Sequence, residues 1–212
     1  MQQSKQYKRI GIMGGTFDPV HIGHLVAAEE AHAQFELDTV IFMPAGKPAF
    51  KEKQQVTPAW HRLMMTELAT ASNPHFEVSS LEIEREGTTY TIDTIRELKK
   101  LYPEAEFFFI TGSDAVFDII GWKDSKELAT LVTFIATTRP GYDIEDAKKR
   151  HQESILNFKI EWIEVPALSV SSTDLRERLK AGRPVRYLIT RSVFGYILKN
   201  HLYDVPEGED VE

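Results

Sequence analysis

Residues 14–24 read Gly14-Gly15-Thr16-Phe17-Asp18-Pro19-Val20-His21-Ile22-Gly23-His24. The apolar run over residues 9–15 predicts a buried strand, and the apolar spacing over residues 22–35 predicts a helix. A strand that leads through glycines into a helix N-terminus is typical of an anion site, because free backbone N–H groups and the helix dipole meet there. His21 and His24 stand three residues apart, so we expect both side chains to point the same way.

Strand and helix patterns alternate along most of the remaining chain. Further strands are expected at residues 39–44, 76–79, 106–111, 131–137 and 160–165, and helices at residues 58–71, 91–101 and 171–201. This order predicts an α/β fold, a Rossmann-like parallel sheet with helices on both faces and a small C-terminal helical subdomain over residues 171–203. Residues 160–165 alternate in polarity and are expected nearer an edge. Ligands of such sheets bind beyond the carboxyl ends of the strands.

The composition of the 212 residues is that of an average soluble globular protein, with 42% hydrophobic and 27% charged residues. We expect one domain over residues 1–203 and a solvated acidic tail over residues 204–212. The rest of the chain is nearly neutral without a basic cluster, which argues against a nucleic-acid partner. Without Cys or an apolar run of ~20 residues, we expect a cytoplasmic protein with no membrane contact.

Three interpretations of residues 14–24 compete. The glycine spacing matches neither the G-x-G-x-x-G fingerprint nor a P-loop. A His21–His24 metal pair would lack a Cys and an obvious third ligand, so we expect no protein-held metal. Simple packing of two histidines is the ordinary alternative, but their position at a glycine-rich strand end favours a phosphate site.

A second anion-site candidate lies near the other end of the chain. Ser171, Ser172 and Thr173 precede an apolar-periodic run, and Ser171 with Asp174 resembles a capping box. Read alone, this pattern indicates only a capped helix. Arg176, one turn into that helix, carries a planar fork that suits phosphate.

Residues 14–24 resemble the HxGH signature of the nucleotidyltransferase superfamily and, in their longer form, the bacterial nicotinate mononucleotide adenylyltransferases. Residues 171–176 resemble the SSTxxR motif of the same superfamily. The resemblance implies transfer of AMP from ATP to nicotinate mononucleotide, giving deamido-NAD and pyrophosphate, with Mg²⁺ accompanying ATP. It extends over nearly everything from residue 8 to residue 203.

Site roles follow from this resemblance. It implies catalytic roles for His21, His24, Lys51 and Arg176. It implies ATP contacts from Gly14, Gly15, Thr16, Phe17, His21, Gly23, His24, Gly112, Ser113, Asp114, Arg139, Ser171, Ser172, Thr173 and Arg176. It implies acceptor contacts from Asp18, Lys47, Lys51, Thr89, Tyr90, Thr91 and Trp122, with Trp122 stacked on the pyridine ring. Ala49 and Phe50 depart from the family, which commonly has Pro and His there.

Some questions stay open at this point. We expect Thr91 to cap the following helix, where free N–H groups would receive a nicotinate carboxylate. Nicotinamide mononucleotide and pantetheine phosphate remain alternative acceptors, and a non-catalytic nucleotide sensor remains an alternative of another class. The preference for acid over amide rests on the resemblance alone. A homo-oligomer is left open.

Overall fold

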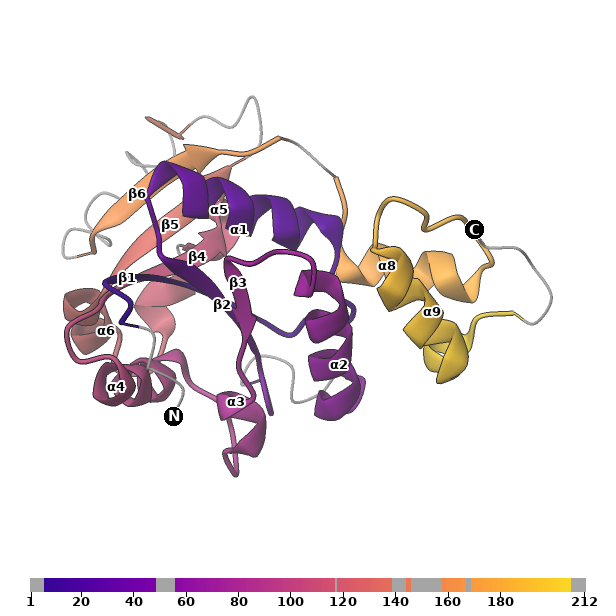
Figure 1. The fold of residues 1–212 in the computed structure, drawn as a ribbon, viewed down its shortest axis with the longest axis horizontal. Coiled ribbons are helices and arrows are strands. Elements are labelled where there is room, and N and C mark those ends of the chain that lie inside the picture. Colours follow the sequence, from indigo (N-terminus) through magenta and orange to yellow (C-terminus); the bar gives the residue numbers. More distant parts are fainter. Residues whose placement is uncertain are drawn as a thin grey trace.

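The computed structural model describes residues 6–48, 56–116, 118–138, 144–145, 158–166 and 169–206, apart from the side chain of Asp114. Its core is a six-stranded sheet in the order β3-β2-β1-β4-β5-β6, in which every pair is parallel (Figure 1). The strands are β1 (Arg9–Gly15), β2 (Thr39–Pro44), β3 (Phe76–Val78), β4 (Glu106–Gly112), β5 (Val132–Thr138) and β6 (Ile160–Glu164). The predicted parallel sheet is confirmed, with β6 at an edge as expected.

The helices surround this sheet. They are α1 (Ile22–Gln34), α2 (Ala59–Thr70), α3 (Leu81–Glu84), α4 (Thr91–Leu101), α5 (Ser113–Val116), η2 (Asp118–Gly121), α6 (Ser125–Leu131), α8 (Ser172–Lys180), α9 (Arg191–Lys199) and η3 (Leu202–Asp204). The sequence did not predict α3, α5, η2 and α6, because four to seven residues are too few to show a helical period. Within the described ranges, no helix is long and apolar enough to cross a bilayer.

Two apolar cores lie on opposite faces of the sheet. Phe107 and Phe109 of β4 belong to the core that includes α4 and α6, whereas Phe108 and Ile110 belong to the core that extends through α1 and α2 to the C-terminal helices. Successive side chains of a strand point to opposite faces, so one apolar run supplies both cores. The predicted helices on both faces are confirmed.

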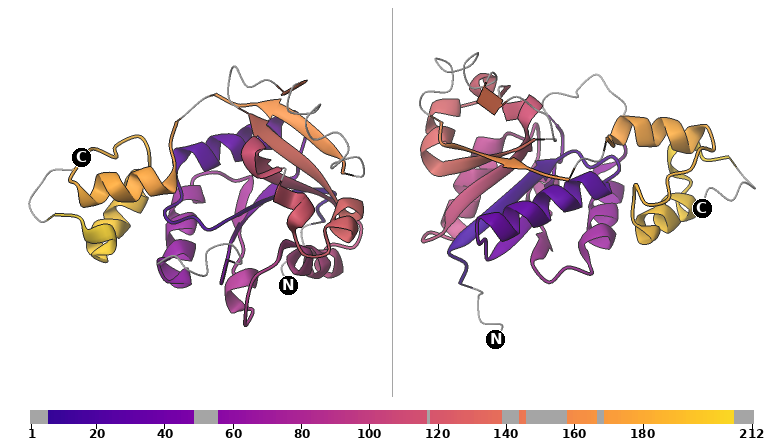
Figure 2. Two further views of the ribbon diagram at one scale, coloured as in Figure 1. Left: turned by 180° about the vertical axis from the view of Figure 1, so that it is seen from behind. Right: turned by 90° about the horizontal axis from the view of Figure 1, so that it is seen from above.

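The C-terminal helices form a separate group beside α2, away from the sheet (Figure 2). The hydroxyl of Tyr196 on α9 lies 2.9 Å from Nδ1 of His61 on α2. The expectation of a continuous helical run to residue 201 is wrong for residues 181–190, where the chain turns. Gly182 has φ 64°, a left-handed conformation that ends α8, and Pro184 follows it. The expectation of a solvated tail from residue 204 is wrong for Asp204, which belongs to η3, and for Val205, which packs against the core; residues 207–212 lie outside the described residues.

Candidate active site

The two histidines of residues 14–24 stack at the N-terminus of α1. His21 is the extended N-cap, with φ −143°, and its backbone N–H donates to Nδ1 of His24 at 3.2 Å. The ring centroids are 3.7 Å apart, and the ring planes differ by 22°. The prediction that both side chains point the same way is confirmed.

Burial keeps the side chains of His21 and His24 uncharged. It lowers the pKa of His21 to about 4, and burial together with His21 holds the pKa of His24 well below its ordinary value. Both imidazoles are therefore neutral near pH 7. Nδ1 of His24 accepts a hydrogen bond, so its proton lies on Nε2, which is then a donor. Nδ1 of His21 is buried and has no hydrogen-bond partner in the part of the chain that the structure describes.

The glycines of this segment make room for protein side chains. A Cβ on Gly15 would come within 2.8 Å of the Phe17 ring, and one on Gly14 within 3.0 Å of the Phe109 ring. A Cβ on Gly23 would meet Nδ1 of His21 at 3.1 Å. Aromatic and imidazole rings therefore fill the space where a side chain at these positions would lie, and the ATP contacts expected of the three glycines stay predictions. Phe17 in turn meets His24 edge-on at 5.0 Å, so close packing supports the histidine pair.

The second motif docks on the loop that leads into His21. Ser171 caps α8, as predicted, because its side chain accepts from the N–H of Asp174 at 3.2 Å. The hydroxyl of Ser172 donates to the carbonyl of Pro19 at 2.9 Å. Arg176 donates from Nη1 to the carbonyl of Asp18 at 2.7 Å. Two segments more than 150 residues apart in the sequence therefore meet beside the N-terminus of α1.

Asp18 lies at this junction, and its side chain serves the protein itself. It is 3% exposed, and its carboxylate accepts from the hydroxyl of Tyr203 at 2.7 Å and from the N–H of Thr57 at 3.2 Å. These contacts are structural; a contact between Asp18 and the acceptor stays a prediction.

The loop after β2 is joined to the segment before α4. The N–H of Lys47 donates to the side chain of Thr89 at 3.1 Å, and the N–H of Thr89 donates to the carbonyl of Lys47 at 2.9 Å. Lys47 is exposed, whereas Thr89 is buried. Two segments predicted to bind the acceptor therefore lie together. Lys51, Ala49 and Phe50 lie outside the described residues.

Aromatic side chains line the next part of this region. Trp122 packs against Phe109 with ring centroids 5.7 Å apart and ring planes at 83° to each other, so the indole rests against the core. The ammonium of Lys123 lies 4.6 Å above the ring of Tyr90. The structure thus brings Tyr90 and the segment of Trp122 together.

The expected cap of α4 is displaced by one residue. Thr91 is the first helical residue, and Tyr90, with extended φ −121° and ψ 135°, is the N-cap. The carbonyl of Tyr90 accepts from the N–H groups of Asp93 at 3.1 Å and of Thr94 at 3.4 Å. The N-cap prediction for Thr91 is therefore wrong, although the free N–H groups of a first turn remain at this place.

Gly112 and Ser113, two further predicted ATP contacts, lie where β4 ends. Gly112 is its final residue, and Ser113, which is buried, begins α5. Arg139 lies outside the described residues, as does the side chain of Asp114. Their proposed contacts stay predictions.

Sequence reasoning missed Arg62, which ties these loops together. Its guanidinium, in a residue 1% exposed, donates to three carbonyls: Thr57 at 2.8 Å, Thr16 at 2.7 Å and Gly46 at 3.0 Å. Burial lowers the pKa of Arg62, and the nearby charge of Asp18 partly offsets this. Arg62 is the one charged residue among the buried residues of α2, and a lone cation on that face is the signal that could have identified it.

The sequence of this chain is similar to those of known proteins. The cytidylyltransferase-like family model matches residues 12–178. A Corynebacterium kroppenstedtii protein named "Probable nicotinate-nucleotide adenylyltransferase" is 50% identical over 209 residues, 99% of this chain and 97% of that protein. A Thermoanaerobacter protein of the same name is 51% identical over 206 residues, 96% of this chain and 98% of that protein.

Solved structures share the fold. The nicotinic acid mononucleotide adenylyltransferase of Plasmodium falciparum, complexed with NaAD, aligns with a TM-score of 0.76 at 23% identity over 95% of this chain and 100% of that chain. A structure from Vibrio parahaemolyticus, described as a putative nicotinate-nucleotide adenylyltransferase, aligns with a TM-score of 0.67 at 19% identity over 97% of this chain and 99% of that chain.

Proposed function

The chain belongs to the cytidylyltransferase-like family and, within it, to the nicotinate-nucleotide adenylyltransferases, and we propose which of its residues carry out the transfer. It is a nucleotidyltransferase of NAD biosynthesis that transfers AMP from ATP to nicotinate mononucleotide, giving deamido-NAD and pyrophosphate. The observation that supports our assignment of residues is the contact between the two motifs. Arg176 and Ser172 both bond to carbonyls of the loop that leads into His21.

The reaction requires alignment of the attacking phosphate with the α-phosphorus of ATP and does not require a strong base. The attacking group is a phosphate monoester with a second pKa of about 6, so it is already ionised near pH 7. One of its oxygens attacks the α-phosphorus of ATP, the bond from that phosphorus to the bridging oxygen breaks, and pyrophosphate leaves with the electron pair. Catalysis then consists of in-line positioning and stabilisation of the charge that moves onto the leaving group.

His24 and His21 fit the reacting phosphate. The Nε2–H of His24 is a neutral donor whose tautomer is held by the His21 backbone. A donor fixed in advance stabilises developing charge without reorganising during the reaction. The stacked His21 ring keeps that donor in place, because the two rings are in contact at 3.7 Å.

Arg176 fits the phosphates that depart. Its hydrogen bonds to the Asp18 carbonyl and to the Thr173 side chain use two of its five N–H donors. We assign the remaining donors, together with the N-terminus of α8, to the β- and γ-phosphates of ATP.

The acceptor site is proposed from the joined segments on the other side. Lys47 and Lys51 would neutralise the acceptor phosphate, and Trp122 would stack on the pyridine ring. Thr89 bonds to the backbone at Lys47, so the loop after β2 and the N-terminus of α4 would enclose the acceptor together.

The described residues do not form a cage for Mg²⁺. Among them, no group of three His, Cys, Asp or Glu side chains could hold a metal ion, and both oxygens of the Asp18 carboxylate accept protein hydrogen bonds. We therefore propose that Mg²⁺ arrives as part of the MgATP substrate, bound to the phosphate oxygens. The cytoplasmic location stays a prediction from the sequence.

Steady-state pyrophosphate release tests the assignment of the acceptor. ATP would be combined in turn with nicotinate mononucleotide, nicotinamide mononucleotide and pantetheine phosphate. We expect turnover with the first to be far the fastest. Faster turnover with pantetheine phosphate would overturn the acceptor assignment, and no turnover with any acceptor would favour a nucleotide sensor.

A further inference from the structure

We infer that Tyr203, in the C-terminal turn η3, is a positioning residue that holds Arg176 for phosphate binding through Asp18. The inference rests on the phosphate-binding role proposed for Arg176. Tyr203 itself lies outside both sequence motifs and has no proposed contact with either substrate.

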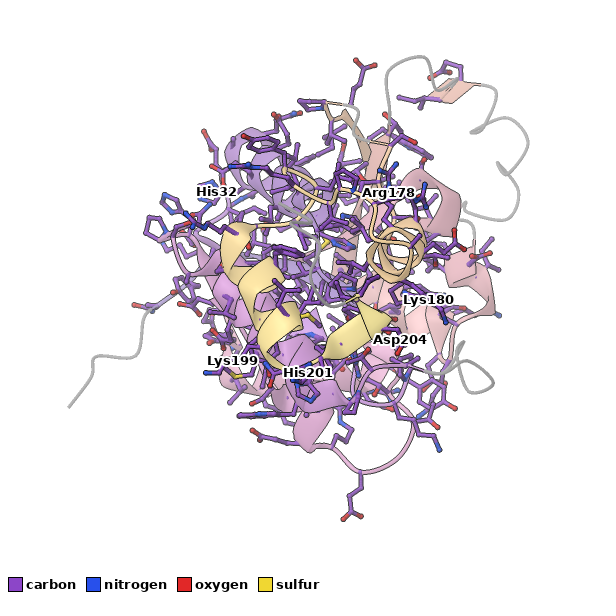
Figure 3. All side chains as sticks on the ribbon, turned by 90° about the vertical axis from the view of Figure 1, so that its right-hand side faces the viewer. His32, Arg178, Lys180, Lys199, His201 and Asp204 are labelled. Atoms are coloured by element: carbon purple, nitrogen blue, oxygen red, sulfur yellow. The ribbon has the colours of Figure 1, made fainter. Side chains whose placement is uncertain are left out.

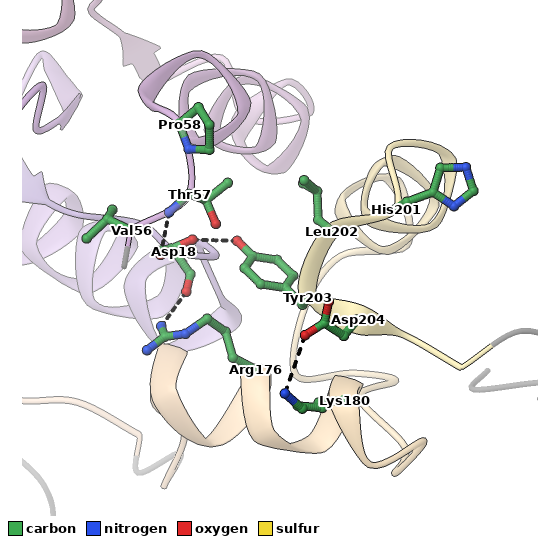
Figure 4. A pocket seen from close by; sticks show the side chains of 10 residues that line it. All are labelled: Asp18, Val56, Thr57, Pro58, Arg176, Lys180, His201, Leu202, Tyr203 and Asp204. Carbon is green, nitrogen blue, oxygen red and sulfur yellow. Dashed lines mark hydrogen bonds and ion pairs between the residues drawn. The ribbon is translucent and has the colours of Figure 1, made fainter. Parts of the chain in front are cut away.

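Three hydrogen bonds converge on Asp18 (Figure 4). The hydroxyl of Tyr203 donates to Oδ1 at 2.7 Å, and the N–H of Thr57 donates to Oδ2 at 3.2 Å. Arg176 donates to the backbone carbonyl of the same residue at 2.7 Å. Both carboxylate oxygens are thus held, so the peptide whose carbonyl receives the guanidinium is held as well.

The position of Arg176 at the wall of a pocket makes its hydrogen bond to the Asp18 carbonyl important for its orientation. Arg176 lines a pocket of about 360 Å³ together with Thr57, Lys180, Tyr203 and other residues (Figure 4). Packing alone does not fix a side chain at the wall of an open pocket. The residue whose carbonyl accepts from Arg176, Asp18, is by contrast buried and fixed by its surroundings. A displacement of about 1 Å can cost 10²-fold in rate when a group aligns reacting phosphates.

Tyr203 is a permanent donor in this arrangement. Burial, followed by the negative charge of Asp18, raises the pKa of the Tyr203 hydroxyl above its ordinary value, so the proton stays on the oxygen. Asp18 is 3% exposed, and a buried carboxylate needs donors. Loss of this one hydroxyl would leave Oδ1 without the donor that holds it.

The backbone of η3 carries strain that such a contact explains. His201, Tyr203 and Asp204 have φ values of 51°, 64° and 51°, in the left-handed region that favours glycine. Non-glycine residues keep such conformations only where surrounding contacts hold them. Asp204 is also paired with Lys180 of α8 at 3.4 Å (Figure 3). Lys180 lies one helical turn beyond Arg176, so η3 contacts this face of α8 directly at Lys180 and, through Asp18, indirectly at Arg176.

The test compares two tyrosines that each lose only a hydroxyl. Tyr203→Phe removes the bond to Asp18, and the control Tyr196→Phe removes a bond of similar length, 2.9 Å, to His61, which lines no part of the pocket. ATP affinity would be measured by calorimetry, and KM and kcat for both substrates by pyrophosphate release. We expect Tyr203→Phe to weaken ATP binding and raise its KM about tenfold, with the acceptor KM changed less than about twofold.

Tyr196→Phe should change neither KM, even if it lowers the melting temperature as much. Equal ATP affinity in Tyr203→Phe and wild type would overturn the inference, as would an equal rise of both KM values, which indicates general loosening. In an Asp18→Ala background, Tyr203→Phe should weaken ATP binding no further, and an additive loss would contradict the path through Asp18.

Calorimetry separates this inference from the proposed function. A wild-type protein that binds ATP without adenylylating any acceptor would refute the proposed function, while the affinity of Tyr203→Phe would still decide the role of Tyr203. A wild-type protein that binds no ATP would overturn both.

Discussion

The side chain of His24 accepts a hydrogen bond from the backbone N–H of His21 at 3.2 Å, and the two rings stack at 3.7 Å. The first contact fixes the tautomer of His24, and the second fixes the plane of its ring. A neutral imidazole held in this way differs from a free cationic side chain, because it is already oriented when charge develops on the substrate.

His24→Ala removes that donor, so kcat should fall by about 10²–10³ with a smaller change in the acceptor KM. His21→Ala should behave similarly, and the double variant should lose less than the product of the two, since both side chains serve one phosphate. His32→Ala, at the other end of α1, is the control and should keep full turnover. Unchanged kcat in His24→Ala would refute the proposed role.

Arg176→Lys keeps the charge but loses the planar fork, so kcat/KM for ATP should fall by about tenfold or more. Arg178→Lys is the matched control on the same helix, because Arg178 pairs with Asp174 at 2.7 Å outside the pocket. Its kinetic constants should stay close to those of the wild type. If both lysine variants behaved alike, Arg176 would be only a surface residue of α8.

Arg62→Met would leave three carbonyl oxygens without their donors, including those of Thr16 and Gly46 in the two substrate loops. Unsatisfied buried groups cost about 1–3 kcal/mol each, so we expect a loss of several kcal/mol and a melting temperature lower by about 10 °C. Arg9→Met, which removes a half-buried arginine at the start of β1, is the control in thermal unfolding. A melting temperature within a few degrees of wild type would show that other groups satisfy these carbonyls.

Arg62 also shows where prediction from the sequence ends. The strand over residues 9–15, the helix after it and the Ser171 cap follow from local periodicity and local hydrogen-bonding chemistry. The partners of Arg62 lie on two separate connections, one after β1 and one between β2 and α2, and the partner of Tyr203 lies 185 residues away. Only the folded chain brings such groups together. Gly23 is a further example, since the Val170 side chain that a Cβ there would meet at 3.1 Å comes from a distant segment.

Stability should depend on pH through Glu82. Burial raises the pKa of its carboxyl to about 7; hydrogen bonding from Thr94 and the charge of Arg85 oppose this, and the charge of Glu97 adds to it. Between about pH 4.5 and 7 the folded chain holds a proton that the unfolded chain has released, so rising pH destabilises the fold across that window by up to about 3 kcal/mol.

Glu82→Gln can still accept the hydrogen bond that Thr94 donates at 2.6 Å, but it does not titrate. The variant should therefore melt above the wild type at pH 8 and close to it at pH 5. Comparing the two chains at each pH cancels the contribution of the histidines, whose pKa values are lowered. An equal difference in melting temperature at both pH values would show that Glu82 does not titrate in this window.

We predict selectivity for acid over amide from the geometry at the N-terminus of α4. The N–H groups of Asp93 and Thr94 bond to the carbonyl of Tyr90, and those of Thr91 and Ile92 belong to the first turn, where a helix offers donors without acceptors. A carboxylate accepts from both, whereas the NH₂ of an amide would leave donors unpaired. Such mismatches cost about 1–3 kcal/mol each, so kcat/KM for nicotinate mononucleotide should exceed that for the nicotinamide form by about 10² or more.

Trp122 should contribute affinity to both acceptors alike, because an aromatic ring stacks equally well on either pyridine ring. Trp122→Ala should therefore raise both acceptor KM values in parallel and leave the ratio of the two kcat/KM values nearly intact. Trp122→Phe, which keeps an aromatic face, should recover much of the lost affinity. If the ratio of kcat/KM for the two acceptors fell towards one in Trp122→Ala, the indole and not the helix N-terminus would be what distinguishes acid from amide. Comparable kcat/KM for the two acceptors in the wild type would refute the selectivity argument and leave the adenylyl transfer standing.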